Sequence, residues 1–164
     1  MSAELILDRW LHVVAGITWI GLLYYFNLVQ TPGLAAAKAD GSAAGITRHI
    51  APRALLWFRW AAVVTWLSGA AYLLRAAHLS LTDAFLLQGA SALIGVGAWL
   101  GTIMLFNVWV LIWPNQKKVL GIVLADDAAK ARAGRVAFLA SRTNLMLSIP
   151  MAFFMVAGPH GLPV

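Results

Sequence analysis

The sequence has no cysteine among its 164 residues. Without a thiol the chain can form no disulfide, hold no iron–sulfur cluster, use no cysteine nucleophile and attach no c-type haem through a Cys-x-x-Cys-His motif. Charge is scarce too, because 11% of the residues are charged and 62% are hydrophobic, with a mean hydropathy of +0.81. A soluble domain of this length does not carry so much apolar surface. These absences indicate a membrane protein.

Long stretches without charge locate the expected membrane helices. None of the residues between Arg9 and Lys38 is charged, and the same holds from Ala84 to Gln116. About 20 apolar residues cross a bilayer. The sequence therefore predicts an all-α fold, a four-helix transmembrane bundle that forms a single domain over residues 1–164. The expected helices lie at about 5–30, 53–77, 84–113 and 139–158, with a cytoplasmic, interfacial amphipathic segment at 115–137.

Proline and glycine mark two local features. The run Thr31-Pro32-Gly33 predicts the end of the first helix. Gly97 and Gly101 form a G-x-x-x-G motif, which favours a close helix–helix contact within the bundle or in a homodimer. The alternative is room for a flat cofactor against that helix.

Basic residues predict the topology. With four helices, both termini lie on one side of the membrane and the two longer loops on the other. Ten basic residues map to the loop side: Lys38, Arg48, Arg53, Arg59, Lys117, Lys118, Lys130, Arg132, Arg135 and Arg142. Only Arg9 and Arg75 map to the terminal side. The positive-inside rule then predicts a multi-pass protein of the bacterial inner membrane with both termini outside, in the periplasm. The net charge of +6 thus reflects topology and anionic lipid headgroups, with no reason to invoke nucleic acid.

Polar side chains share one face of the first helix. At about 100° per residue, His12 falls on the same narrow arc as Asp8, Gly16, Asn27 and Gln30. Lipid cannot satisfy amides, so this face should point into the bundle. Asn27 and Gln30 are expected to bond neighbouring helices.

Three histidines map to the terminal end of the expected bundle. His12 lies inside the first span, His78 ends the second helix and His160 follows the fourth, whereas His49 maps to the loop side. Neutral imidazole is the usual axial ligand of b-type haem, so these three are candidate metal ligands for haem b. A copper or zinc site, or no cofactor, is the alternative. His78 and His160 would then be ordinary interfacial residues.

Two arginines lie within the expected spans, Arg59 and Arg142. They can snorkel to headgroups, or clamp a carboxylate such as a haem propionate. Arg53 would complete an inward-facing basic cluster with them.

Four stretches resemble the membrane domain of the bacterial membrane-bound urate oxidases, the PuuD-type urate hydroxylases. They are Trp10–Gly21, Arg48–Arg59, Phe106–Lys118 and Ala140–Met151. The first helix is also similar to that of the HemJ-type protoporphyrinogen oxidases, small haem-binding membrane proteins with a histidine near the start of helix one. Full-length members of the first family carry a C-terminal cytochrome c domain. Because this chain lacks a Cys-x-x-Cys-His motif, the resemblance implies a separate cytochrome c or a quinone as redox partner.

The sequence therefore favours a haem b-binding integral membrane protein for redox or electron transfer. A non-catalytic accessory or assembly subunit of a larger respiratory complex is one alternative. The other is a membrane oxidoreductase that oxidises urate or a porphyrin and passes electrons to a separate acceptor.

Overall fold

The computed structural model describes residues 2–160, and the side chains of residues 2–157. It is 88% helix, and the described residues contain no strand. Four helical segments are long and apolar enough to cross a membrane: Ala3–Ala39, Ala43–Arg75, Gly89–Val119 and Asp127–Ala157. The predicted all-α fold is confirmed, and four helical segments have the length and apolar composition that the predicted membrane spans require.

Each of the first three segments is built from several helical elements. The first joins α1 (Ala3–Tyr24), the π-helix η1 (Tyr25–Gln30) and α2 (Thr31–Ala39). The second joins α3 (Ala43–Gly45), the π-helix η2 (Ile46–Ile50) and α4 (Ala51–Arg75). The short α5 (Leu81–Leu86) and the 3₁₀ turn η3 (Gly89–Ser91) lead into α6 (Ala92–Phe106), the π-helix η4 (Asn107–Ile112) and α7 (Trp113–Val119). The fourth segment is one helix, α8 (Asp127–His160).

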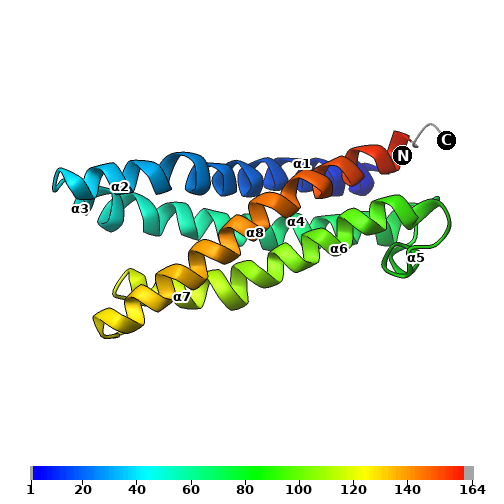
Figure 1. The fold of residues 1–164 in the computed structure, drawn as a ribbon. Coiled ribbons are helices and arrows are strands. Elements are labelled where there is room, and N and C mark those ends of the chain that lie inside the picture. The colour runs from blue at the N-terminus through cyan, green and yellow to red at the C-terminus, as the bar shows by residue number, and fades with distance from the viewer. Residues whose placement is uncertain (1, 161–164) are drawn as a thin grey trace.

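The four segments form two antiparallel hairpins (Figure 1). Helix α1 packs along α4, and α6 with α7 packs along α8. Both termini and α5 lie at one end of the bundle, here called the terminal end. The turn between α2 and α3 and the turn between α7 and α8 lie at the opposite end, the loop end. Helix α8 crosses the first hairpin obliquely, so the two hairpins diverge toward the loop end (Figure 1).

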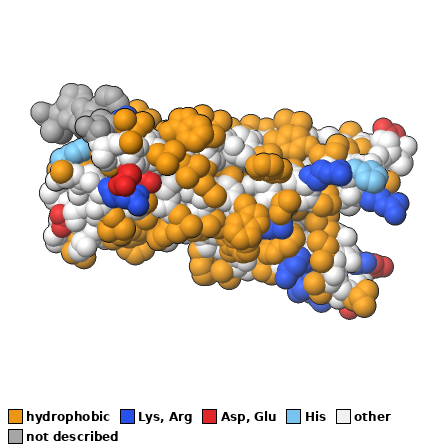
Figure 2. All heavy atoms as spheres, turned by 180° about the vertical axis from the view of Figure 1, so that it is seen from behind, with side chains coloured by type: hydrophobic (Ala, Val, Ile, Leu, Met, Phe, Trp, Pro, Cys, Tyr) orange, Lys and Arg blue, Asp and Glu red, His pale blue; other side chains and the backbone are white. Residues whose placement is uncertain are grey.

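Burial and exposure follow what a bilayer requires. Trp19, Leu23, Phe58 and Met104 are almost fully buried where the hairpins meet. Large apolar side chains elsewhere point outward, among them Ile17, Leu67, Leu74, Met146 and Ile149. Figure 2 shows this apolar surface along the middle of the bundle, with most Lys and Arg side chains toward the loop end. An exposed apolar surface of this extent is more stable in hydrocarbon than in water.

The predicted stop at Pro32 is wrong, because the helix continues to Ala39. A π-helix ends two residues before Pro32, and the same arrangement precedes Pro52 and Pro114. Proline cannot donate a backbone hydrogen bond, and its ring clashes with the carbonyl four residues earlier. The wider π turn relieves that clash: Thr31 donates its N–H to Phe26 O, five residues back.

The expected interfacial segment at 115–137 is not a separate element. Helix α7 carries the third span to Val119, and α8 begins at Asp127 rather than near residue 139. Asp126 explains the early start, since its Oδ1 accepts the N–H of Ala129 at 2.6 Å and so caps the helix. At 1.5 Å per residue α8 is about 50 Å long, so it extends well beyond a hydrocarbon core of about 30 Å.

The glycines of the third segment differ in how closely other residues approach them. A Cβ on Gly97 would lie 3.1 Å from Met155 Cε, whereas one on Gly101 would have nothing within 4 Å. The close backbone contact lies instead at Gly95, where a Cβ would sit 2.0 Å from Ala84 O in α5. Within the bundle, the close backbone contact therefore lies at Gly95 and not at Gly101, and a contact of Gly101 in a homodimer stays a prediction.

Candidate functional site

The polar face predicted for the first helix does point into the bundle. Near the terminal end it meets α4: Asp8 forms an ion pair with Arg75, and His12 lies one turn further along the same contact. Toward the loop end the same face carries Asn27, which is buried. The helical periodicity of the sequence was enough to find this face, because a period of 3.6 residues fixes which side chains share a side.

His12 is held in one orientation by α4. Its Nδ1 lies 2.7 Å from the backbone carbonyl oxygen of Thr65, and that carbonyl can only accept, so Nδ1 carries the proton. The lone pair is then on Nε2, which forms no hydrogen bond with the described residues. Gly69 makes room for the ring, because a Cβ there would lie 2.8 Å from His12 Nδ1 and Cε1.

Neither His78 nor His49 joins this contact. His78 is exposed in the turn after α4, and His49 is exposed in η2 at the loop end. His160 is the last residue of α8, and its side chain lies outside the described residues. Among residues 2–157 no three His, Asp or Glu side chains form a group that could hold a metal ion. The assignment of His12, His78 and His160 as ligands stays a prediction.

The two arginines of the proposed clamp pack on different aromatic rings. Arg59 Cζ lies 3.9 Å from the centre of the Trp113 ring in α7, and Arg142 Cζ lies 5.2 Å from the centre of the Phe138 ring. Arg142 Nε is buried without a hydrogen-bond partner. Arg53 is exposed and donates to the carbonyl of His49, so it does not join them. Cation–π contacts of this kind stabilise a guanidinium away from water.

A column of polar side chains runs along the inner face of α8. Asn144 is fully buried; its Oδ1 accepts from Asn107 Nδ2 at 2.8 Å and its Nδ2 donates to Met104 O at 3.0 Å. One turn toward the loop end, Ser141 Oγ accepts from Asn27 Nδ2 at 2.8 Å. Buried amides in hydrocarbon must be paired in this way. The bond between Asn27 and Ser141 joins the two hairpins.

The column opens at the loop end into a cavity of about 200 Å³ between the two hairpins. Its polar lining comes from all four segments: Asn27, Gln30, Thr31, Thr47, Gln116 and Ser141. All three π-helices border it, and no charged side chain lines it. The Oε1 atom of Gln30 is buried and has no hydrogen-bond partner. We call this space the loop-end cavity.

Sequence reasoning missed the loop-end cavity. Its lining combines residues from four helices, and single-helix periodicity cannot say which helices meet. A signal was nevertheless present, because Pro32, Pro52 and Pro114 all lie near the loop end of their helices. Prolines that widen three helices at one depth favour loose packing there, and π turns occur frequently at functional sites.

Comparison with known proteins gives one match. The family described as urate oxidase N-terminal matches residues 76–162, a little over half of the chain. The matched region runs from the end of α4 through α5, α6, α7 and α8, so it includes Arg142 and the polar column of α8 but neither His12 nor Arg59. No curated protein and no solved structure matches the chain.

Proposed function

The chain belongs to the urate oxidase N-terminal family, and from that premise we propose that it is a haem b-binding membrane protein of redox or electron transfer. The proposal rests on the geometry of His12. An axial imidazole needs its ring orientation and its tautomer fixed by a partner on the other nitrogen. The bond from Nδ1 to Thr65 O supplies both, and it leaves Nε2 free to bind iron.

Small and apolar residues surround His12. Gly69 and Gly16 keep the contact between α1 and α4 narrow, and the neighbouring side chains Val13 and Ile17 are apolar and exposed toward the lipid. Haem b would supply one-electron exchange at its iron. His12 would hold the iron through Nε2, and Thr65 O would fix the orientation of its ring. His78 and His160 remain the candidates for a second ligand, and Arg59 and Arg142 for binding the propionates.

The absorption spectrum of purified protein tests this proposal. We expect a Soret band and sharp reduced α and β bands for the wild type, and loss of haem or conversion to high spin for His12→Ala. His49→Ala is the control, since His49 is exposed at the loop end. A wild-type protein without haem absorption, or an unchanged spectrum in His12→Ala, would refute the proposal and favour the accessory-subunit function.

A second variant tests whether the orientation of the His12 ring matters for haem binding. Gly69→Ala places a methyl group against the imidazole of His12 and should break its bond to Thr65 O. We expect haem to remain with a shifted reduction potential or a partly high-spin spectrum. Gly21→Ala is the matched control, because a Cβ on this α1 glycine meets nothing within 4 Å. Equal spectra for both variants would mean that Gly69 does not support a ligand.

Oxidation of urate is the second candidate, and the loop-end cavity favours it. The cavity is lined by the amide side chains of Asn27, Gln30 and Gln116 and by the rings of Phe26, Phe58 and Phe138. A small planar heterocycle with N–H donors could pair with an amide oxygen and stack on a ring. Arg142, one residue from Ser141, is the candidate for binding an anion. Electrons would leave to a separate cytochrome c or a quinone.

Equilibrium binding of labelled urate to the protein in nanodiscs tests this candidate. Gln30→Ala should weaken binding by about tenfold, since it removes one buried hydrogen bond. Gln88→Ala, which changes an exposed glutamine near the terminal end, should bind as the wild type does. If urate shows no saturable binding, or if both variants bind alike, the cavity is not a urate site.

We further propose that the protein lies in the bacterial inner membrane with its loop end in the cytoplasm and both termini in the periplasm. The split of ten basic residues against two supports this orientation. Because the chain has no cysteine, a single introduced thiol reports its own side. A membrane-impermeant maleimide added to intact spheroplasts should label Ser2→Cys and spare Lys130→Cys. The reverse pattern would overturn the orientation.

A further inference from the structure

Two cationic side chains lie against one tryptophan ring near the loop end. Arg59 Cζ lies 3.9 Å from the centre of the Trp113 ring, and Lys117 Nζ lies 5.9 Å from the same point. Arg59 belongs to α4 in the first hairpin, whereas Trp113 and Lys117 belong to α7 in the second. The ring therefore gathers a positive charge from each hairpin at one place. We call Arg59 and Lys117 the cation pair.

No carboxylate of the described residues neutralises the cation pair. The ion pairs formed within residues 2–157 include neither Arg59 nor Lys117. Their side-chain nitrogen atoms form no hydrogen bond with the described residues, and these atoms are not covered by the protein. Two cations held against one ring repel each other, so an anion bound beside them would be stabilised. The pair is open to a ligand with negatively charged oxygens.

The cation pair lies at the depth of lipid head groups. From Ala92, where α6 begins, to Trp113 the helix rises by about 30 Å, which is the thickness of a hydrocarbon core. Trp57 and Trp60, within one turn of Arg59, are 66% and 51% exposed. Tryptophan is enriched at the boundary between hydrocarbon and head groups. Lipid phosphates lie at this level, and their oxygens match the donors of a guanidinium group.

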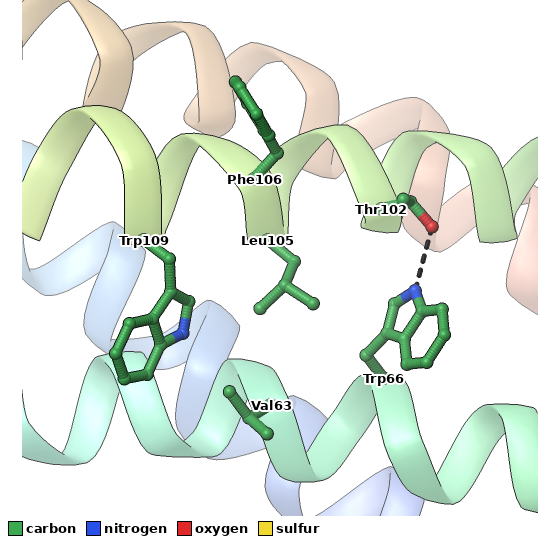
Figure 3. Close-up of a pocket in the computed structure, with 6 residues that line it drawn as sticks. All are labelled: Val63, Trp66, Thr102, Leu105, Phe106 and Trp109. Atoms are coloured by element: carbon green, nitrogen blue, oxygen red, sulfur yellow. Dashed lines mark hydrogen bonds between the residues drawn. The ribbon is translucent and has the colours of Figure 1, made fainter.

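An apolar hollow begins one helical turn from the cation pair, toward the middle of the bundle. It has a volume of about 390 Å³ and lies between α4 and the α6–η4 stretch. Val63 and Leu105 line its middle, and Trp109 borders it on the loop-end side (Figure 3). Val63 lies one turn along α4 from Arg59, and Trp109 lies one turn before Trp113. The pair and the hollow therefore follow one another along the same two helical segments.

The hollow offers only apolar surface to an occupant. Its one side-chain hydroxyl, on Thr102, accepts from Trp66 Nε1 at 2.9 Å and donates to Ala98 O at 2.8 Å (Figure 3). Trp109 Nε1 is covered, so it is not available to a ligand. Between Thr102 and Trp109 the hollow extends for about 10 Å along the helix. A hydrocarbon chain suits such a surface, and a polar ligand does not.

We propose that the cation pair and the hollow together bind one anionic phospholipid, with its phosphate beside Arg59 and Lys117 and part of one acyl chain in the hollow. The hollow alone would accept a chain of any lipid. The cation pair supplies the selection, because two positive charges without a carboxylate favour a lipid of net negative charge over a zwitterionic one. Such a lipid would join the two hairpins.

The inference goes beyond the proposed function, since it requires no haem. It assigns Arg59 to a lipid phosphate, and Arg142 is then the remaining candidate for the propionates.

Native mass spectrometry of the delipidated protein in detergent tests this proposal. Phosphatidylglycerol and phosphatidylcholine with identical acyl chains are titrated separately. We expect one phosphatidylglycerol to bind about tenfold more tightly than phosphatidylcholine, and Arg59→Gln and Lys117→Gln each to remove most of this preference. Lys118→Gln is the matched control, because it removes the same charge from the next residue, which does not contact the Trp113 ring.

Two further arms separate the parts of the site. Leu105→Trp fills the hollow and should weaken binding of both lipids, with circular dichroism as the check that this variant is folded. Glycerol phosphate carries the charged group without acyl chains and should not displace bound phosphatidylglycerol. Its displacement of the lipid would mean that the pair binds a free phosphate ester, and full binding in a folded Leu105→Trp would mean that no chain enters the hollow. Either result overturns the inference.

The preference for the anionic lipid decides the rest. Equal binding of the two lipids by the wild type, or an equal loss of preference in Lys117→Gln and Lys118→Gln, would show only diffuse surface charge and overturn the inference. Haem is measured in the same samples. Haem loss in Arg59→Gln with an unchanged lipid preference would assign Arg59 to a propionate and refute the lipid site. A preference for phosphatidylglycerol in a wild type without haem supports the inference and refutes only the proposed function.

Discussion

At the terminal end the helices approach so closely that a methyl group on Gly95 or Gly69 would collide with a neighbour, whereas at the loop end they leave a cavity of about 200 Å³. The terminal end is held by an ion pair between Asp8 and Arg75 and by the bond from His12 to Thr65 O. The loop end has three π turns, each followed by a proline. One bundle thus combines a rigid half suited to orienting a ligand with a looser half suited to admitting one.

The same difference appears in polar chemistry. At the terminal end Asp8 and His12 of α1 are each paired with a group of α4. At the loop end Gln30 Oε1 and Arg142 Nε are buried without partners. Unpaired polar atoms cost stability, so they mark places where function, rather than folding, explains the residue. The comparison therefore predicts that substitutions at the two ends act on different properties, stability at one and binding at the other.

The largest effect should come from adding one methyl group at each end. Gly95→Ala drives a Cβ to 2.0 Å from the backbone carbonyl oxygen of Ala84, which cannot move aside as a side chain would. We expect a loss of about 3 kcal/mol in the free energy of unfolding. Gly134→Ala at the loop end meets only Val119 Cγ2 at 3.8 Å, and alanine favours a helix. It should be neutral or stabilising by up to about 1 kcal/mol.

Titration with a denaturing detergent from micelles, followed by circular dichroism, measures both variants. Gly101→Ala is a further control, since this buried glycine of the same helix as Gly95 has nothing within 4 Å of its Cβ position. Equal stability of Gly95→Ala and Gly101→Ala would contradict the close contact between α5 and α6 and remove the basis for calling the terminal end rigid.

Much of this architecture was accessible from the sequence. Four apolar stretches predicted the four long helical segments, and helical periodicity placed Asp8, His12 and Asn27 on the inward face of the first segment. The ends of the helices were harder to predict from the sequence, because a proline usually ends a helix. Only the backbone structure shows that a π turn accommodates Pro32. The contact at Gly95 and the two hollows depend on which helices meet and at what angle. That information lies in packing between distant residues, which single-helix patterns do not carry.

A smaller effect should come from the polar column between the two ends. Asn144→Ala leaves Asn107 Nδ2 without its acceptor and removes the side-chain donor to Met104 O. Hydrogen bonds between membrane helices are modest, so we expect a loss of about 1–2 kcal/mol. Asn115→Ala is the matched control, because Asn115 Nδ2 bonds only to Leu111 O in its own helix. It should cost less than about 0.5 kcal/mol.

A double variant, Asn107→Ala with Asn144→Ala, isolates the bond between the two side chains. The coupling free energy should be about 0.6 kcal/mol. A coupling near zero would mean that the column fills space without binding the helices together. The contacts at the terminal end alone would then hold the two hairpins together.

The smallest effect should lie at the exposed tip of the loop end. Asp40 Oδ1 accepts from the backbone N–H of Ser42 at 3.0 Å and from its hydroxyl at 2.6 Å, which closes the turn between α2 and α3. These two bonds, the hydroxyl first, lower the pKa of the Asp40 carboxyl below its ordinary value of 3.8. A lowered pKa in the folded state means that the turn is stabilised above the ordinary pKa and loses that contribution as the pH falls through the folded value.

Between about pH 5 and pH 2 the wild type should therefore lose slightly more stability than Asp40→Ala, and the two unfolding curves should converge at the acid end. Because the carboxyl is fully exposed, water and salt screen it and the difference should be small. Parallel curves across that range would show that the turn at the loop end does not depend on Asp40.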